Sequence, residues 1–225
     1  MKKIIFLVSG NGGNLKFIHE CIKLNHLSDC TISCVIADRD CEALSFARGH
    51  NIESFLVVYD RNNPDALKTL LKKYESDLII TNIHKIIDAG IINLFKNKLI
   101  NLHYSLLPSF KGLIGEVPVK HALEAHCKVI GSTVHFVEES VDEGEIISQC
   151  AFSVNEEYLF KELMKLIFKS GCLNLLNSIY ITLNMNIACQ DDVANIDDNM
   201  FLFSPGLKFE HKCFDKKFWS RIITY

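Results

Sequence analysis

Features that mark several protein classes are missing from this chain of 225 residues. It has no uninterrupted apolar run of about 18 residues, the length that a membrane-spanning helix requires. Its 24 lysines and arginines are nearly balanced by 27 aspartates and glutamates, and they are spread along the chain. No basic face for nucleic acid is therefore expected. These absences favour a globular protein with neither membrane nor nucleic acid as a partner.

Closely spaced cysteine pairs are also missing. The nine cysteines contain no CxxC pair, and several lie in apolar runs, so we interpret them as reduced core thiols of a cytoplasmic protein. The opening MKKIIFLVSG resembles a signal peptide, but its apolar run ends after Val8 and leads into glycines rather than a cleavage site. We therefore expect no signal peptide.

Apolar runs alternate with helical patterns through the first 103 residues. Strands are expected over 4–8, 31–37, 54–59, 78–81 and 99–103. Helices are expected after an Asn14 cap, over 41–48, after an Asn63 cap with Pro64 at the first helical position, and over 88–96. This order of elements predicts a parallel sheet wrapped by helices.

The pattern changes after Gly112. A helix is expected over 117–126, strands over 133–137 and 146–152, and a long helix over 156–180. The two strands are separated by a short acidic turn that leaves no room for a crossover helix, so they should pair antiparallel. The tail from Gln190 is first polar and then rich in aromatic residues.

The segment SGNGGN, from Ser9 to Asn14, joins the first strand to the first helix. Glycines there let the backbone approach a ligand, and the first N–H groups of a helix can bind an anion. The segment lacks the lysine and serine of a Walker loop and does not match GxGxxG. It favours a phosphate-binding loop, and the alternative is an ordinary turn from strand to helix.

Asn101 and His103 end the predicted strand 99–103. Residues two apart on a strand point to the same side, and ligands of open parallel sheets bind beyond the carboxyl ends of the strands. An amide and an imidazole there can polarise a carbonyl group and stabilise an oxyanion. Alternatively, the pair holds the loop that follows.

The sequence VDEG places Asp142 in the acidic turn, where Gly144 indicates a tight turn that fixes the carboxylate. The alternative is an ordinary solvent-exposed turn. His135 lies inside the preceding strand, so we interpret it as a packing residue rather than a catalyst.

In combination, the segment from Asn101 to Gly112 and the later VDEG turn resemble the folate-dependent formyltransferases, whose motifs are NxHxSxLPxxxG and DxG. SGNGGN is similar to the phosphate loop of the glycinamide ribonucleotide formyltransferase branch. The resemblance covers about residues 1–185, which we take as one domain, with 186–225 as a C-terminal extension that forms a hairpin or contacts a second subunit. It implies an α/β fold that is three-layered and Rossmann-like, with a mostly parallel sheet and an antiparallel pair after the central motif. It also implies 10-formyltetrahydrofolate as co-substrate, no metal, and a monomer or homodimer.

The resemblance also implies roles for individual residues. Asn101 would bind the formyl oxygen, and His103 would stabilise the oxyanion as an imidazolium whose pKa is raised by Asp142. Asp142 would also help to remove the proton of the attacking amine, and Ser105 would shape the loop. The substrate phosphate would be held by Gly10, Asn11, Gly12, Gly13 and Asn14. The folate would be held by Ile83, His84, Lys85, Ile86, Val137, Glu138, Val141 and Gly144.

Some positions depart from that branch. Tyr104 stands where the branch usually has proline, Lys85 stands near the place of an arginine, and the stretch FKSGCLNLL lacks the usual carboxylate, although its Lys169 could reach a phosphate. The acceptor is therefore open between glycinamide ribonucleotide, a nucleotide-linked amino sugar, and water in a deformylase. A non-catalytic folate- or phosphate-binding protein is a further alternative.

Overall fold

The structure is a computed structural model that describes residues 1–155, 157–186 and 191–223. The chain divides into two compact units. The first contains Met1–Asn101 and the residues from Phe214 onward, and the second contains Leu102–Cys213. Strand β5 (Leu99–His103) leaves the first unit and enters the second.

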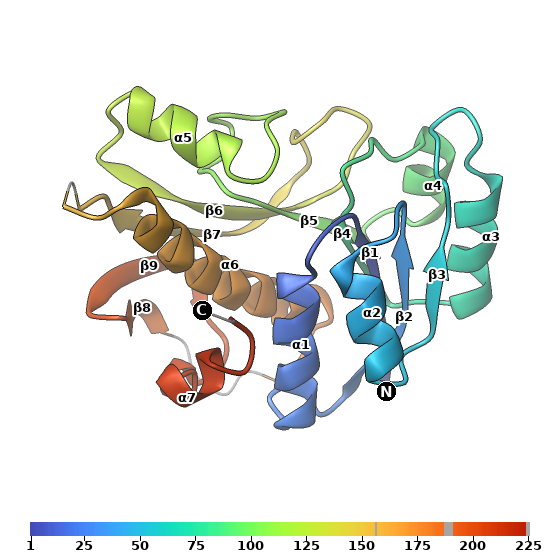
Figure 1. Ribbon diagram of the computed structural model, residues 1–225, viewed down its shortest axis with the longest axis horizontal. Coiled ribbons are helices and arrows are strands. Elements are labelled where there is room, and N and C mark those ends of the chain that lie inside the picture. Colours follow the sequence, from blue (N-terminus) through green and yellow to red (C-terminus); the bar gives the residue numbers. More distant parts are fainter. Residues whose placement is uncertain (156, 187–190, 224–225) are drawn as a thin grey trace. The chain divides into compact units, whose positions relative to one another are not determined.

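The first unit is built on a parallel sheet (Figure 1) with the strand order β3-β2-β1-β4-β5. All four pairings between these strands are parallel, which confirms the predicted arrangement. The strands before β5 are β1 (Lys2–Val8), β2 (Cys30–Ala37), β3 (Ser54–Leu56) and β4 (Leu78–Asn82). The helices that alternate with them are α1 (Gly13–Lys23), α2 (Glu42–Gly49), α3 (Asp65–Tyr74) and α4 (Ala89–Leu94).

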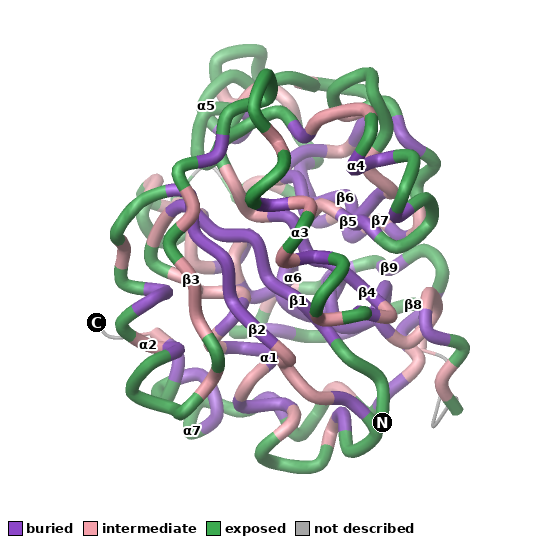
Figure 2. Tube along the Cα trace, turned by 90° about the vertical axis from the view of Figure 1, so that its right-hand side faces the viewer, coloured by how far each residue is buried: buried purple, intermediate pink, exposed green. Residues whose placement is uncertain are grey.

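The core of this unit is formed by the central strands, which Figure 2 shows as largely buried. Residues 4–7 of β1 have no exposed surface, because helices cover both faces of a parallel sheet. A continuous apolar run, rather than an alternating one, is the sequence signature of such a strand. This explains why β1 could be predicted from the sequence.

Three predicted element ends in this unit are wrong. Helix α1 is capped by Gly12 in the left-handed conformation, with φ 69°, so Asn14 already lies inside the helix. The Asn14 amide instead donates to Asn82 Oδ1 over 3.3 Å. Helix α3 is capped by Pro64 rather than Asn63. Strand β3 ends at Leu56, because the chain then turns away and Tyr59 binds the segment after β4.

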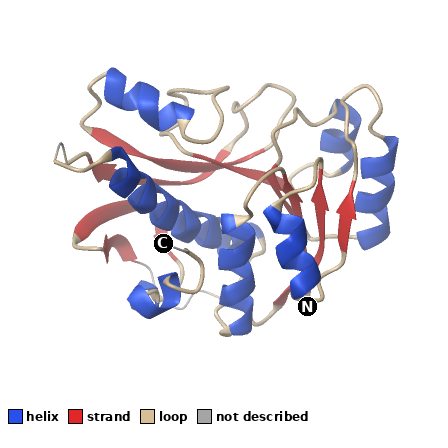
Figure 3. Cartoon of the chain, viewed as in Figure 1, coloured by secondary structure: helices blue, strands red, loops and turns tan. Residues whose placement is uncertain are grey.

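The second unit has antiparallel strands in the order β6-β7-β9-β8. The antiparallel pairing of β6 with β7 confirms the prediction. Figure 3 shows the long helix α6 beside these strands. The elements are α5 (Val117–Glu124), β6 (Val129–Phe136), β7 (Ile146–Ser153), α6 (Phe160–Thr182), β8 (Asp191–Ile196) and β9 (Asn199–Leu207).

A buried polar network joins α6 to β6 and β7. Ser148 Oγ donates to Asn174 Oδ1 over 2.7 Å and lies 2.6 Å from Ser178 Oγ. The Asn174 amide donates to the backbone oxygen of Ser132 over 3.2 Å. All four residues are buried, and satisfied polar networks of this kind fix one arrangement of the packed elements. Helix α6 therefore holds the two strands whose connection carries Asp142.

The end of the chain packs on helix α1 in the first unit. Trp219, in the short helix α7 (Lys216–Trp219), stacks on Phe17 with ring centroids 5.5 Å apart. Phe214 and Phe218 contact the same Phe17 ring. Arg221 Nη1 lies 2.6 Å from Glu20 Oε1. Aromatic stacking and this ion pair therefore attach the C-terminal segment to α1.

None of the helices that the structure describes is both long and apolar enough to cross a membrane. Eight of the nine cysteines lie among the described residues, where they are thiols rather than disulfides. Cys189 lies outside the described residues.

Candidate active site

Strand β5 places Asn101 and His103 at its carboxyl end, with the bounds that the sequence predicts. Asn101 pairs with Thr81 of the neighbouring parallel strand β4. His103 is 5% exposed, and Asn101 is half-buried. Both side chains belong to the same side of the strand because they are two residues apart.

His103 lies beside Asp142, as the sequence comparison with the formyltransferase motifs predicts. Nδ1 of His103 is 3.5 Å from Oδ2 of Asp142, and both side chains are about nine-tenths buried. The other ring nitrogen, Nε2, is 3.1 Å from the backbone oxygen of Phe110. The ring therefore faces an acceptor at each nitrogen, although a neutral imidazole carries only one proton.

The Asp142 carboxylate is fixed by its own turn and by the loop before α5. Its backbone is left-handed, with φ 56°, which is uncommon for a residue with a side chain. The Gly112 N–H donates to Oδ2 over 2.8 Å, and Lys111 forms an ion pair with Glu143. A Cβ atom at Gly144 would collide with the backbone oxygen of Phe136. The glycine of VDEG is therefore required by this close approach.

His135 is the residue whose role the sequence did not reveal. It is 2% exposed, in agreement with a packing histidine, but its Nε2 lies 3.5 Å from Oδ1 of Asp142. Its Nδ1 is 2.8 Å from the Phe136 backbone oxygen, so this ring also faces an acceptor at each nitrogen. The carboxylate thus stands between two buried imidazoles. The only sequence signal for such a role of His135 was its position near the end of β6, shortly before the VDEG turn.

Asp142 acts on the pKa of His103 in the expected direction, but the pKa is lowered overall, so the expected imidazolium is not supported. Burial of the ring lowers the pKa below its usual value of 6.5, and the nearby His135 lowers it further. Asp142 and the Phe110 backbone oxygen oppose this shift without overcoming it. The imidazole is therefore neutral at pH 7, because desolvation disfavours its charged form more than one carboxylate favours it.

Asp142 itself remains ionised. Burial alone would raise its pKa, but the hydrogen bonds from His135 and from the Gly112 N–H lower it below its usual value. Positive charge on His103 or His135, when either ring is protonated, acts in the same direction. A buried carboxylate that stays ionised can accept a proton.

The Gly10–Asn14 loop lies in the first unit, between β1 and α1. Only a glycine fits at position 12, because its φ is 69° and a Cβ atom there would lie 2.8 Å from the Cβ of Ala43. Helix α1 has no acidic residue in its first turn and no side-chain cap. Its first N–H groups and the positive end of its dipole are thus not neutralised by a carboxylate of that turn. The loop has the features of an anion-binding site.

The residues predicted to bind folate fall into two groups. Ile83, His84, Lys85 and Ile86 follow β4 in the first unit, where the His84 N–H donates to Ser9 Oγ over 2.7 Å. Val137, Glu138, Val141 and Gly144 belong to the β6–β7 connection of the second unit, with Val141 45% exposed and Gly144 buried. The second group surrounds Asp142 in the sequence.

Two further features lie in the second unit. Lys169 of α6 is bound by Asp197, with Nζ 2.5 Å from Oδ2. The described residues contain no group of three or more His, Cys, Asp or Glu side chains arranged to hold a metal ion.

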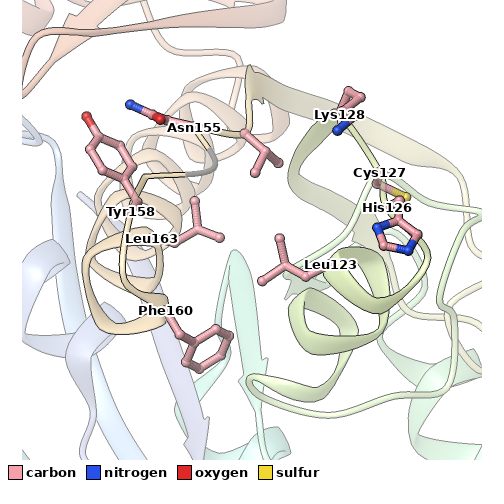
Figure 4. Close-up of a pocket in the computed structure, with 9 residues that line it drawn as sticks. Leu123, His126, Cys127, Lys128, Asn155, Tyr158, Phe160 and Leu163 are labelled. Carbon is pink, nitrogen blue, oxygen red and sulfur yellow. The ribbon is translucent and has the colours of Figure 1, made fainter.

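A pocket of about 340 Å³ lies between the ends of α5 and β7 and the start of α6 (Figure 4), and none of the predicted site residues lines it.

Comparison with known proteins gives a consistent family. The formyl transferase family model matches residues 2–176. The chain is 34% identical to phosphoribosylglycinamide formyltransferase of Haemophilus influenzae, over 72% of this chain and 78% of the relative. It is 31% identical to the chloroplastic enzyme of that name from Arabidopsis thaliana, over 73% of this chain, and spans only 59% of that relative's length.

Solved structures agree. Glycinamide ribonucleotide transformylase 1 from Symbiobacterium toebii superposes with a TM-score of 0.75 at 29% identity, covering 90% of this chain and 94% of the other. A formyltetrahydrofolate deformylase of Escherichia coli is also a relative, 31% identical over 61% of this chain and 49% of its own length. The family match over most of the chain and the pairing of His103 with Asp142 lead to one conclusion: the chain belongs to the formyl transferase family.

Proposed function

We propose that this protein transfers the formyl group of 10-formyltetrahydrofolate to the amine of a phosphate-bearing substrate, most simply glycinamide ribonucleotide in purine biosynthesis. The observation that carries the proposal is the buried pair of His103 and Asp142 in a member of the formyl transferase family, with His103 two residues beyond Asn101 on the same strand. We assign the formyl transferase domain to residues 1–185 and the C-terminal extension to 186–225.

The chemistry requires one bond to form and one to break. The amine nitrogen attacks the formyl carbon, and the resulting oxyanion is stabilised by hydrogen bonds from Asn101 and His103. Asp142, which is ionised, receives the proton that the attacking nitrogen loses. Asp142 then gives this proton to N10 of the folate as the bond from the formyl carbon to N10 breaks, so N10 leaves protonated and the carboxylate is regenerated. No covalent enzyme intermediate is required.

Each substrate has a proposed set of contacts. The phosphate binds the backbone N–H groups of the Gly10–Asn14 loop, because they combine with the positive end of the α1 dipole. The folate binds the segment Ile83–Ile86 and the β6–β7 connection. Backbone groups in both segments supply donors and acceptors for its pterin ring.

A nucleotide-linked amino sugar is a second candidate acceptor. The stretch 168–176 of α6 contains no carboxylate, and its one lysine, Lys169, is bound by Asp197. A ribose held by a carboxylate at this stretch is therefore not supported. An acceptor with the same phosphate but a different sugar would fit this change.

The test is an assay of purified protein with 10-formyltetrahydrofolate, in which folate absorbance reports loss of the formyl group. Three parallel reactions contain glycinamide ribonucleotide, a nucleotide-linked amino sugar, or no amine. We expect turnover that depends on one of the amines and that His103→Ala lowers strongly. Equal turnover without an amine would identify a deformylase, and no turnover in any reaction would overturn the proposal.

A further inference from the structure

Two residues next to the candidate active site, Tyr104 and Gly171, pack closely against each other. Tyr104 directly follows His103, where the chain leaves β5. Its ring packs against Gly171 of helix α6, where a Cβ atom would lie 2.9 Å from Tyr104 Cε1 and 3.6 Å from Cδ1. Leu102 contacts the same position at 3.4 Å. Position 171 therefore has no room for a side chain while the Tyr104 ring keeps its place.

The glycine is unusual in its setting. Helix α6 runs over 23 residues, and every residue from Lys169 to Ile179 is buried. Glycine is the least favourable residue after proline in the interior of a helix. Gly171 thus weakens the helix at the one place where the tyrosine ring needs the space. We conclude that the contact between Tyr104 and Gly171 stabilises the position of the tyrosine ring at the expense of the helix.

The Tyr104 hydroxyl has no hydrogen-bond partner among the residues that the structure describes, and it is not sealed from solvent. It is therefore available to a ligand. Tyr104 keeps intermediate exposure, while its strand neighbours Leu102 and His103 are buried. Burial of the ring raises the pKa of the phenol, so the hydroxyl stays protonated and can donate.

We propose that Tyr104 determines acceptor specificity, by donating a hydrogen bond from its hydroxyl to an oxygen atom of the amine substrate. The inference rests on the proposed formyl transfer and adds a residue to its acceptor site. Ligands of parallel sheets bind beyond the carboxyl ends of the strands, which is where Tyr104 stands. Gly171 acts through Tyr104 and is a positioning residue.

The test compares Tyr104→Phe with the wild-type protein, because this change removes only the hydroxyl. Calorimetry measures the Kd of glycinamide ribonucleotide and of a nucleotide-linked amino sugar, and kinetics give KM and kcat. We expect the Kd and KM of the acceptor to rise about tenfold, the scale of one lost hydrogen bond. The Kd of 10-formyltetrahydrofolate and the midpoint of unfolding should stay unchanged.

Tyr158→Phe is the matched control. The Tyr158 hydroxyl is paired within the protein, 3.2 Å from Asn199 Oδ1 and 3.0 Å from its Nδ2. Its loss should lower the unfolding midpoint and leave acceptor binding unchanged, which is the opposite result. Gly171→Ala should displace the ring and weaken acceptor binding, and its effect on the midpoint should shrink in a Tyr104→Ala background.

The outcomes separate the two proposals. If the wild-type protein binds an amine and Tyr104→Phe binds it equally well, the specificity role is overturned and formyl transfer stands. If the wild-type protein binds neither amine and releases formate without one, both proposals fall together.

Discussion

His103 and His135 contact opposite oxygens of one carboxylate, that of Asp142, each over 3.5 Å. The two histidines come from different strands, β5 and β6, and both are buried. Contacts on both oxygens fix the orientation of the carboxylate. Both histidines also influence its pKa.

Replacement of His103 or Asp142 should abolish most of the activity. We expect His103→Ala and Asp142→Asn each to lower kcat at least ~10²-fold, the typical cost of losing an oxyanion donor or an acid–base partner. Circular dichroism should show an intact fold. Near-normal turnover in both variants would remove these residues from the mechanism.

His135 should matter through Asp142. We expect His135→Leu to lower kcat by about tenfold, because a hydrogen bond to a charged group contributes roughly 1.5–3 kcal/mol. His135→Gln should retain more activity, since its amide can still donate to the carboxylate. Steady-state kinetics of the two variants decide the point: equal losses would indicate that His135 only fills space.

Gly144 should resist even the smallest substitution. In Gly144→Ala the new Cβ atom would collide with the Phe136 backbone oxygen, so the turn that carries Asp142 must move. We expect a lower free energy of unfolding and a lower kcat. Gly49→Ala is the control, because nothing lies within 4 Å of its Cβ position in α2. That change should be neutral or slightly stabilising.

The glycine loop should bind free phosphate. We expect inorganic phosphate to inhibit competitively against the amine and not against the folate. Gly12→Ala should raise the KM of the amine, because it strains a left-handed backbone and presses on Ala43. Inhibition that competes with the folate instead would place phosphate elsewhere.

Stability should fall in weak acid. The pKa of His103 lies below 6.5 in the folded protein, so below pH 6.5 the unfolded chain binds a proton that the folded protein does not. The free energy of unfolding should therefore decrease as the pH falls from 6.5 towards the folded pKa. Denaturant titrations should show a shallower decrease in His103→Gln, whereas the exposed His121→Gln should follow the wild-type protein.

Local patterns predicted the elements better than their ends. The bounds of β5 and the antiparallel pairing of β6 with β7 follow from apolar runs and from the length of the connection between them. The start of α1 could not be predicted from Asn14, because the deciding fact is the left-handed conformation of Gly12. That conformation depends on the close approach of Ala43, which is distant in the sequence.

For the candidate site too, local features could be predicted from the sequence, and features that depend on packing could not. The spacing of Asn101 and His103 on one strand is a local property and could be predicted. The contact of His135 with Asp142, and the lowering of the His103 pKa, arise from burial by packed elements. No local pattern reports how far a ring is removed from water, so the sign of that pKa shift had to come from the structure.

The stacking of Trp219 on Phe17 has a consequence for the order of events during protein synthesis. More than a hundred residues of the second unit emerge from the ribosome between helix α1 and the aromatic segment that covers it. Until that segment appears, Phe17 and the Glu20 carboxylate lack their final neighbours. Contacts between such distant residues form slowly, and partly folded chains that expose apolar surface tend to aggregate. Nascent chains halted before Phe214 should therefore depend most on chaperones.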